Sequence, residues 1–123
     1  MKKIYLSSSV IGAPLSGAIE INGTVFVSGQ VHSNAEWKLH GDTIEERFDI
    51  VISNIRNILR EASLTLEDIV FVRIYVTDIK EMPALNAIYK KHFFDPLPAR
   101  TAVAVSALPL GASLEIEVIA SRQ

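Results

Sequence analysis

The sequence contains no cysteine, only six glycines and one tryptophan among 123 residues, and few aromatic side chains, at 7%. Without cysteine the chain can form no disulfide, no thiolate metal site and no thiol nucleophile, a composition compatible with a reducing compartment. The glycines form neither a phosphate-cradling loop nor a dinucleotide-binding fingerprint. These absences exclude redox chemistry by the protein itself, and we expect no cofactor.

Charge of one sign and long apolar runs are also lacking. The 12 Lys and Arg residues nearly balance the 14 Asp and Glu residues, which leaves a net charge of −2 and no field that would hold a polyanion. No apolar stretch approaches the roughly 20 residues that cross a bilayer. The opening apolar run stops at Ser7-Ser8-Ser9 without a signal-peptide cleavage site. We therefore expect a cytoplasmic protein with neither a nucleic-acid nor a membrane partner.

Apolar residues are plentiful, at 49%, and a chain of this length folds around one core, so we expect a single domain over residues 1–123. Asn22-Gly23 is a preferred hairpin turn, and Asp42 to Glu45 offers a helix capping box. The strand over 69–77 is apolar at nearly every position, which is typical of a strand buried on both faces. The pattern predicts strands over 4–6, 18–21 and 25–31, a loop over 33–41, a helix over 44–62, a strand over 69–77, a helix from 80 until Asp95-Pro96-Leu97-Pro98, and strands over 99–105 and 113–120.

The predicted order is β-β-β-α-β-α-β-β, an α+β fold. Two helices can cover only one face of such a sheet, while several strands are apolar on both faces. Because the chain offers no further helix, we expect a second copy of the chain to cover the other face, sheet against sheet, in a symmetric homo-oligomer. The alternative is a monomer whose second face is only modestly apolar.

Arg100 is the strongest candidate for chemistry. Strand alternation places it on one face with Ala102 and Ala104, so its guanidinium lies among small apolar side chains. The planar fork of an arginine holds a carboxylate through two parallel hydrogen bonds. A structural salt bridge at the end of a strand is the commoner use of arginine, and the spacing alone leaves both interpretations open.

Glu115 and Glu117 share one face of the last strand. Two carboxylates in a strand interior are unusual, because burying either charge is costly without a partner or a raised pKa. One of them can position a water molecule. The alternative is a solvated face at a sheet edge, which we favour for Glu117.

Other polar residues interrupt apolar strands. Ser28-Gly29-Gln30 indicates either a close approach of a ligand or chain to the backbone, or a β-bulge without function. We assign Arg73 to an inter-strand or interface ion pair. The three histidines, His32, His40 and His92, lack metal-site spacing, so we interpret them as surface or structural residues and predict no metal.

Seven segments, spread over nearly the whole chain, form a recognisable pattern. They are Val27-Ser28-Gly29-Gln30, Leu66-Glu67-Asp68-Ile69-Val70, Tyr75-Val76-Thr77-Asp78, Asn86-Ala87-Ile88-Tyr89, Pro98-Ala99-Arg100-Thr101-Ala102-Val103, Leu108-Pro109 and Leu114-Glu115-Ile116-Glu117. In their order and spacing, these segments resemble the YjgF/RidA family of reactive-intermediate imine deaminases, also described as the endoribonuclease L-PSP family.

The resemblance implies a chorismate-mutase-like fold of the bacillary type, with a mixed sheet covered by two helices on one face. It also implies a homotrimer with a central barrel and active sites in the clefts between subunits. The family's carboxylate-binding arginine falls on Arg100 and its water-positioning glutamate on Glu115. Asn86, Ser28 and Gly29 match further substrate-binding positions.

Two pocket positions depart from the family pattern. Many deaminases read Gly-Pro-Tyr-Ser-Gln-Ala where this chain has Ala13 to Ala18, so Leu15 replaces the tyrosine of the site. Ala102 stands where the family often has cysteine. Both changes make the pocket more apolar.

The implied activity is cofactor-free hydrolysis of 2-imino or 2-enamino acids, such as 2-aminoacrylate, to 2-keto acids and ammonia. Arg100 would hold the carboxylate and Glu115 would activate the water. The alternative is a non-catalytic trimer of the same family that binds small carboxylates or acts as a chaperone. The near-neutral charge and the absence of a paired-histidine motif argue against ribonuclease activity, and chorismate mutase activity is suggested by fold analogy alone.

Overall fold

The computed structural model describes residues 2–7 and 13–122, so Ser8 and Ser9 of the serine stretch lie outside the described residues. The element order is the predicted β-β-β-α-β-α-β-β, with short 3-10 turns between some elements. The strands are β1 (Lys3–Ser7), β2 (Ser16–Ile21), β3 (Thr24–Val31), β4 (Ile69–Val76), β5 (Ala99–Ala104) and β6 (Leu114–Ser121), and the helices are α1 (Ile44–Glu61) and α2 (Met82–Tyr89).

All six strands form one mixed sheet in the order β1-β2-β3-β6-β4-β5, in which β4 and β5 are parallel and the other neighbours are antiparallel. The predicted fold class is confirmed. The last strand, β6, lies between β3 and β4 rather than at an edge. The expectation that Glu117 faces solvent at a sheet edge is therefore wrong, because both sides of its strand are hydrogen-bonded.

Local sequence signals explain most element boundaries. Asn22 and Gly23 have φ values of 50° and 81°, the left-handed conformation of a tight hairpin turn between β2 and β3. The capping box of α1 starts one residue later than predicted. Thr43, which is extended, accepts the N–H of Glu46 at 3.1 Å, and the Glu46 carboxylate accepts the N–H of Thr43 at 3.1 Å. Glu46 also accepts the N–H of Asp42, so it satisfies two backbone donors where Glu45 was expected to satisfy one.

The second helix is shorter than the sequence pattern predicts. A 3-10 turn over Ile79–Glu81 precedes α2, and α2 ends at Tyr89 instead of continuing to Asp95. Phe93 still reaches the core, because hydrogen-bonded turns continue past the helix, with the Phe93 N–H donating to the Tyr89 oxygen at 3.1 Å, and its ring stacks on Tyr89 with centroids 4.3 Å apart. The apolar residues after the helix therefore keep the predicted burial in a different conformation.

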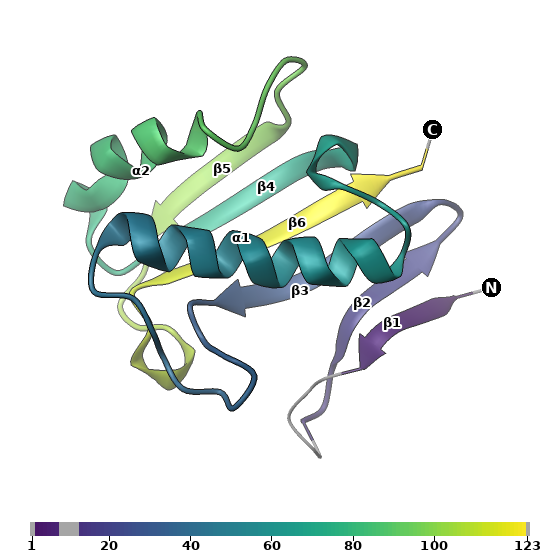
Figure 1. Ribbon diagram of the computed structural model, residues 1–123, viewed down its shortest axis with the longest axis horizontal. Helices are drawn as coiled ribbons and strands as arrows, with labels where there is room; N and C mark the ends of the chain where they lie inside the picture. The colour runs from purple at the N-terminus through teal and green to yellow at the C-terminus, as the bar shows by residue number, and fades with distance from the viewer. Residues whose placement is uncertain (1, 8–12, 123) are drawn as a thin grey trace.

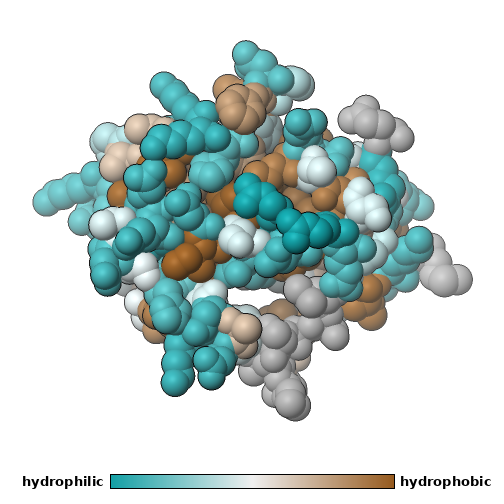
Figure 2. Space-filling model, viewed as in Figure 1, coloured by the Kyte–Doolittle hydropathy of each residue, from teal (hydrophilic) through white to brown (hydrophobic). Residues whose placement is uncertain are grey.

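Both helices lie on one face of the sheet, with α1 across the middle and α2 near β4 and β5 (Figure 1). Between this layer and the sheet is the core, which includes Phe48, Ile52 and Ile55 of α1 and Ile74, Leu114 and Ile116 of the central strands. The outer surface over the helices is mostly hydrophilic (Figure 2). Among the described residues, no helix is both long and apolar enough to span a membrane.

On the opposite face of the sheet, which we call the open face, no helix lies among the residues that the structure describes. The strand register aligns one row of side chains across all six strands on this face, and almost all of them are large and apolar. The row consists of Ile4, Ile19, Phe26, Ile119, Phe71 and Ala99. Phe26 is 46% exposed and Val70, at the start of β4, is 47% exposed. The expectation that β4 is buried on both faces is therefore wrong for a single chain.

Candidate active site

Arg100 is held at the helix-covered side of β5. It pairs in register with Val72, a core residue beneath the helices, so its side chain points toward α2. Its Nη2 donates a hydrogen bond to Asn86 Oδ1 at 2.8 Å, and its guanidinium carbon lies 4.9 Å from the ring centroid of Tyr89. These two contacts orient the guanidinium without neutralising it.

The surroundings of Arg100 leave its positive charge available. The residue is exposed, and no carboxylate in the described part of the chain lies within ion-pair distance of it. Ala102, two residues along the same face, is half-buried against the core. The structure thus favours the ligand-binding interpretation of Arg100 over the structural salt bridge. Arg100, Asn86, Tyr89 and Ala102 form what we call the anchor half-site.

Glu115 lies on the open face of β6, where it pairs in register with Tyr75 of β4 and Val31 of β3. Its carboxylate rests directly against the backbone of Gly29. A methyl group at Gly29 would come within 2.9 Å of the Glu115 carboxyl carbon and would overlap one carboxylate oxygen. Only glycine leaves this space, so the glycine in β3 serves a close approach by a side chain of the same protein.

A bulge brings Gly29 and Ser28 to this position. The β3–β6 register shifts between Val27 and Gln30, so that Ser28 and Gly29 together oppose Glu117. The predicted bulge is confirmed, and the group that approaches the Gly29 backbone is the Glu115 side chain of the same chain, where the sequence suggested a ligand or another chain. Ser28 donates from its hydroxyl to the Ser16 carbonyl at 2.7 Å, which ties the bulge to the start of β2.

Leu15 immediately precedes Ser16, whose carbonyl accepts the Ser28 hydrogen bond, and the Leu15 side chain is 53% exposed. It therefore lies on the Ser28 side of the molecule, beside β2 and β3, and not beside α2. We call Glu115, Ser28, Gly29 and Leu15 the water half-site.

Burial, followed by the negative charge of Glu117, raises the pKa of Glu115 above its usual value. Glu117 itself is paired. It accepts hydrogen bonds from Arg73, at 3.3 Å, and from the Tyr75 hydroxyl. The prediction of an inter-strand ion pair for Arg73 is confirmed. Glu115 has no comparable cationic partner among the described residues, which suits a carboxylate that must exchange protons with a water molecule.

The two half-sites lie on opposite faces of the sheet in one chain. Arg100 shares its face with the core and α2, whereas Glu115 shares the open face with Tyr75 and Glu117. A sheet one residue thick separates them, so one chain cannot bring a small ligand to both. The sequence names the residues of each half-site by number but cannot show that they face apart.

Two residues next to Arg100 and Glu115 were not predicted as neighbours from the sequence: Tyr89, which lies under the Arg100 guanidinium, and Tyr75, the register partner of Glu115. The sequence assigned Tyr89 only to the apolar side of its helix. Tyr89 follows Asn86 by three residues, and residues three apart lie on the same face of a helix, so this spacing could have shown that both face the same strand. Tyr75 was assigned to an apolar strand, and its alternation with Arg73 is the signal that the face they share is partly polar.

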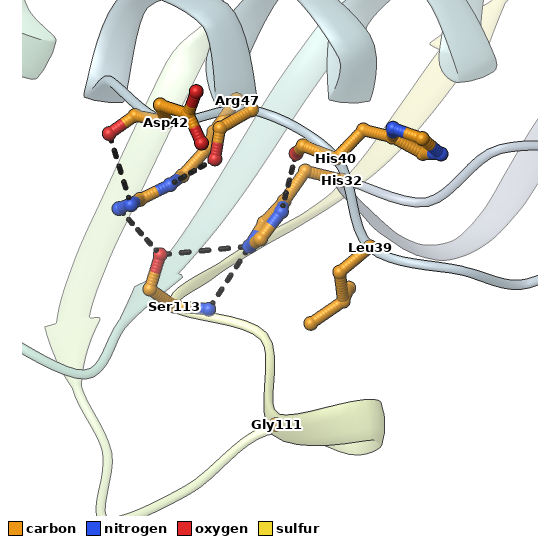
Figure 3. A pocket seen from close by; sticks show the side chains of 8 residues that line it. His32, Leu39, His40, Asp42, Arg47, Gly111 and Ser113 are labelled. Atoms are coloured by element: carbon orange, nitrogen blue, oxygen red, sulfur yellow. Dashed lines mark hydrogen bonds between the residues drawn. The ribbon is translucent and has the colours of Figure 1, made fainter.

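A hollow of about 320 Å³ borders the water half-site, because Ser28, Ser16 and Glu117 are among the residues that line it. Larger hollows of the single chain occur elsewhere. One of about 460 Å³ is lined by a polar cluster that includes His32, His40, Arg47 and Ser113 (Figure 3). Another, of about 480 Å³, lies beside Phe93 and Phe94. In the described ranges 2–7 and 13–122, no group of three or more His, Cys, Asp or Glu residues could hold a metal ion.

Comparison with known proteins points to one family. A family model described as Endoribonuclease L-PSP matches residues 8–122. A RutC family protein of Aquifex aeolicus is 44% identical over 109 residues, covering 87% of each chain. The mitochondrial protein MMF1 of Saccharomyces cerevisiae is 40% identical over 108 residues, covering 88% of this chain and 74% of the yeast protein.

Solved structures agree with the sequence matches. TdcF of E. coli, crystallised with bound serine, superposes with a TM-score of 0.84 at 30% identity, covering 98% of this chain and 99% of TdcF. That relative therefore accommodates a small amino acid on the same fold. Its likeness extends over the anchor and water half-sites alike, since almost all of both chains is matched.

Proposed function

This chain belongs to the Endoribonuclease L-PSP (YjgF/RidA) family, and from that premise we propose that it hydrolyses reactive 2-imino acids to 2-keto acids and ammonia without a cofactor. Membership of the family supports a small-molecule-processing role. The observation that carries the proposal of imine hydrolysis is the guanidinium of Arg100, which is exposed, held in orientation by Asn86 and Tyr89, and without a carboxylate partner among the described residues.

We further propose that the working unit is a homotrimer whose open faces pack against one another around a central barrel. Two observations support this assembly. The apolar row on the open face, Phe26 included, has no cover within the described part of the chain. The anchor and water half-sites also face apart, so a site that uses both requires the anchor of one copy to meet the water half-site of its neighbour.

In the proposed reaction, Arg100 binds the substrate carboxylate through its paired N–H groups, while Asn86 and Tyr89 keep the guanidinium in place. The protonated imine carbon is electrophilic. Glu115 accepts a proton from the attacking water, whose oxygen forms a bond to that carbon and converts the C=N double bond to a single bond. Glu115 then passes this proton to the nitrogen. As the C–N bond breaks, Glu115 accepts the remaining hydroxyl proton, the C–O bond becomes the keto C=O, and the 2-keto acid and ammonia leave. Glu115 returns to its ionised form when it gives this last proton to the departing ammonia or to water. No electrons are gained or lost overall.

The test generates 2-aminoacrylate with a dehydratase and follows pyruvate release above the uncatalysed rate. We expect Arg100→Ala and Glu115→Gln each to lose roughly 10²-fold or more in kcat/KM. The matched controls are Arg60→Ala and Glu67→Gln, which remove exposed charges that belong to neither half-site, and they should keep the wild-type rate. Background rates in the wild type would overturn the deaminase proposal.

A second candidate function is favoured by Leu15, which lacks the hydroxyl of the family tyrosine. In this version the clefts bind small carboxylates without converting them. Titration calorimetry with serine and with a 2-keto acid separates the two candidates. Arg100-dependent binding without any pyruvate release would establish the binding function in place of the enzyme.

The assembly has its own test. Light scattering should give about 41 kDa, three times the 13.6 kDa of one chain. Phe26→Asp, which places a charge in the apolar row, should dissociate the trimer, whereas Phe94→Asp, at a 70% exposed side chain beside α2, should not. A stable 13.6 kDa species in the wild type would contradict a site shared between copies.

A cytoplasmic location remains part of the proposal, and because one relative is named as mitochondrial, cell fractionation is the direct check.

A further inference from the structure

A hollow of about 240 Å³ lies between α1 and the loop that follows β3, and it shares no lining residue with either half-site. We call it the amide hollow, because carboxamide side chains predominate among the polar residues that line it. Those polar residues are Gln30, Ser33, Asn34, Trp37, Asn54 and Asn57. None of the described residues that line the hollow is charged, so an ionic ligand would lose its hydration there without gaining a counter-charge. The wall therefore suits an uncharged ligand with hydrogen-bonding groups.

Asn34 holds the loop at the hollow in one conformation. Its Oδ1 accepts the backbone N–H groups of Glu36, at 2.9 Å, and of Lys38, at 3.0 Å. Its backbone oxygen accepts the Trp37 N–H at 3.0 Å, and its backbone N–H donates to the Lys38 oxygen at 2.9 Å. Within this frame Trp37 has a φ of 63°, a left-handed conformation that bulky side chains rarely adopt. Such strain persists where the surrounding structure imposes it, and it clusters at sites that bind ligands.

Two side chains that line the amide hollow carry polar groups without a partner in the ranges 2–7 and 13–122. The indole Nε1 of Trp37 is buried and has no acceptor. Ser33 is only 5% exposed, and its hydroxyl makes no hydrogen bond to a described residue. A buried donor without a partner costs free energy, and an acceptor atom of a ligand would remove this cost.

The carboxamides of the hollow supply the complementary acceptors. Asn54 of α1 donates from Nδ2 to the backbone oxygens of Val31 and Ser33, each at 3.1 Å. Because both partners are carbonyl oxygens, the orientation of this amide is fixed and its Oδ1 is left without a described partner. Gln30 donates from Nε2 to the Ser28 oxygen at 3.1 Å, which leaves its Oε1 in the same state. The amide hollow therefore combines unpartnered acceptors with unpartnered donors.

We propose that the amide hollow binds a small uncharged molecule in which a carboxamide group is attached to a flat ring. The N–H groups of the ligand donate to the oxygens of Asn54 and Gln30, and its carbonyl oxygen accepts from Trp37 and Ser33. The ring of the ligand packs against the indole of Trp37. This binding does not depend on the proposed deaminase chemistry, since the hollow shares no residue with either half-site.

The test uses the protein in its native assembly and two probes of nearly the same shape, benzamide and benzoate. Benzoate carries a negative charge and lacks the amide N–H groups. Trp37 is the only tryptophan of the sequence, so its indole N–H gives a single signal in a ¹⁵N NMR spectrum. We expect benzamide to shift this signal saturably, with a Kd of about 1 mM or below, and benzoate to leave it in place at the same concentrations.

Three results with the wild-type protein would overturn the proposal. The first is the absence of a saturable shift with benzamide. The second is an equal shift with benzamide and benzoate, which would contradict an uncharged ligand. The third is a saturable shift with glucose but not with benzamide, which would assign the hollow to polyols in place of carboxamides.

Substitutions then locate the site. Ser33→Ala and Trp37→Phe, which keeps an aromatic ring but removes the indole N–H, should each weaken benzamide binding about threefold or more, the loss of one neutral hydrogen bond. The side-chain amide signals of Asn54 report binding in the variant without an indole. The matched control is Ser106→Ala, at an exposed serine outside the hollow, and it should bind benzamide as the wild type does.

The proposed deaminase site has a separate readout. Arg100→Ala should lose pyruvate release but keep the wild-type affinity for benzamide, whereas a loss of benzamide binding in this variant would place the probe at the anchor half-site and overturn the proposal. Unchanged affinity in both Ser33→Ala and Trp37→Phe would also overturn it. If Trp37→Phe does not fold, Ser33→Ala and the two probes with the wild-type protein still decide.

Discussion

Arg100 and Glu115 point away from each other, on opposite faces of one sheet. Arg100 lies over Tyr89 on the helix-covered side, and the Glu115 carboxylate lies against Gly29 on the open side. A reaction that needs both residues therefore needs two copies of the chain. This relationship makes the assembly and the chemistry of the protein testable together.

Mixing two inactive variants should restore activity. If Arg100→Ala and Glu115→Gln chains are denatured together at equal concentration and refolded, about one site in four receives an intact Arg100 from one chain and an intact Glu115 from its neighbour. We expect roughly a quarter of the wild-type rate of pyruvate release. Refolding each variant alone is the control and should give only background. No recovery in the mixture would place both residues of each site on the same chain.

Leu15→Tyr should increase imine hydrolysis, by up to about tenfold in kcat/KM, because it supplies a hydroxyl where the water half-site lacks one. The matched control is Leu110→Tyr, since Leu110 has nearly the same exposure, 54% against 53%, and lies in the turn between β5 and β6. Equal rates in Leu15→Tyr and the wild type would show that the tyrosine position contributes nothing in this chain.

Gly29→Ala should displace Glu115, because the added methyl group overlaps its carboxylate. We expect a loss of about tenfold or more in kcat, with a smaller effect on KM. The same substitution in the Glu115→Gln background should cost no further activity, since the positioned base is already absent. Additive losses in the double variant would instead indicate that Gly29 acts through general folding stability, which circular dichroism melting would report.

Glu117→Gln should shift the acid limb of the activity profile to lower pH. The negative charge of Glu117 contributes to the raised pKa of Glu115, so its removal makes Glu115 easier to ionise. Glu115 must be ionised to accept a proton, and the enzyme should therefore stay active at more acidic pH. A profile of kcat/KM against pH measures the shift. A shift toward higher pH would contradict the assignment of Glu115 as the base.

Glu20 should govern stability in acid. The Arg122 hydrogen bonds, at 2.7 and 3.0 Å, and the Tyr5 hydroxyl lower the pKa of Glu20 from 4.5 to about 2. The stabilisation is therefore complete above pH 4.5 and is lost as the pH falls through about 2. Tm should fall more steeply across this range in the wild type than in Glu20→Gln. The exposed Glu36→Gln control should follow the wild type, and parallel curves for all three would argue against this linkage.

The sequence predicted the local elements well, and where it failed the cause was tertiary. The hairpin at Asn22-Gly23 follows from residues that tolerate positive φ, and α1 follows from apolar spacing and a nearby capping box. The end of α2 was misplaced because the burial of Phe93 has two solutions, a longer helix or a series of tighter turns that stack Phe93 on Tyr89. Periodicity does not distinguish them.

By itself the sequence determined the order of the elements and the side of its strand on which Arg100 lies. It also placed Glu115 and the segment around Gly29 in the pattern of one family. Alternation within a strand is a local property, so it can be read from neighbouring residues. Only the tertiary structure decided that β6 is central, that Glu117 is neutralised by Arg73, and that Arg100 and Glu115 face apart. Those facts depend on which distant strands become neighbours in the sheet. The connections between strands decide this order, and the amino-acid pattern within a strand does not reveal it.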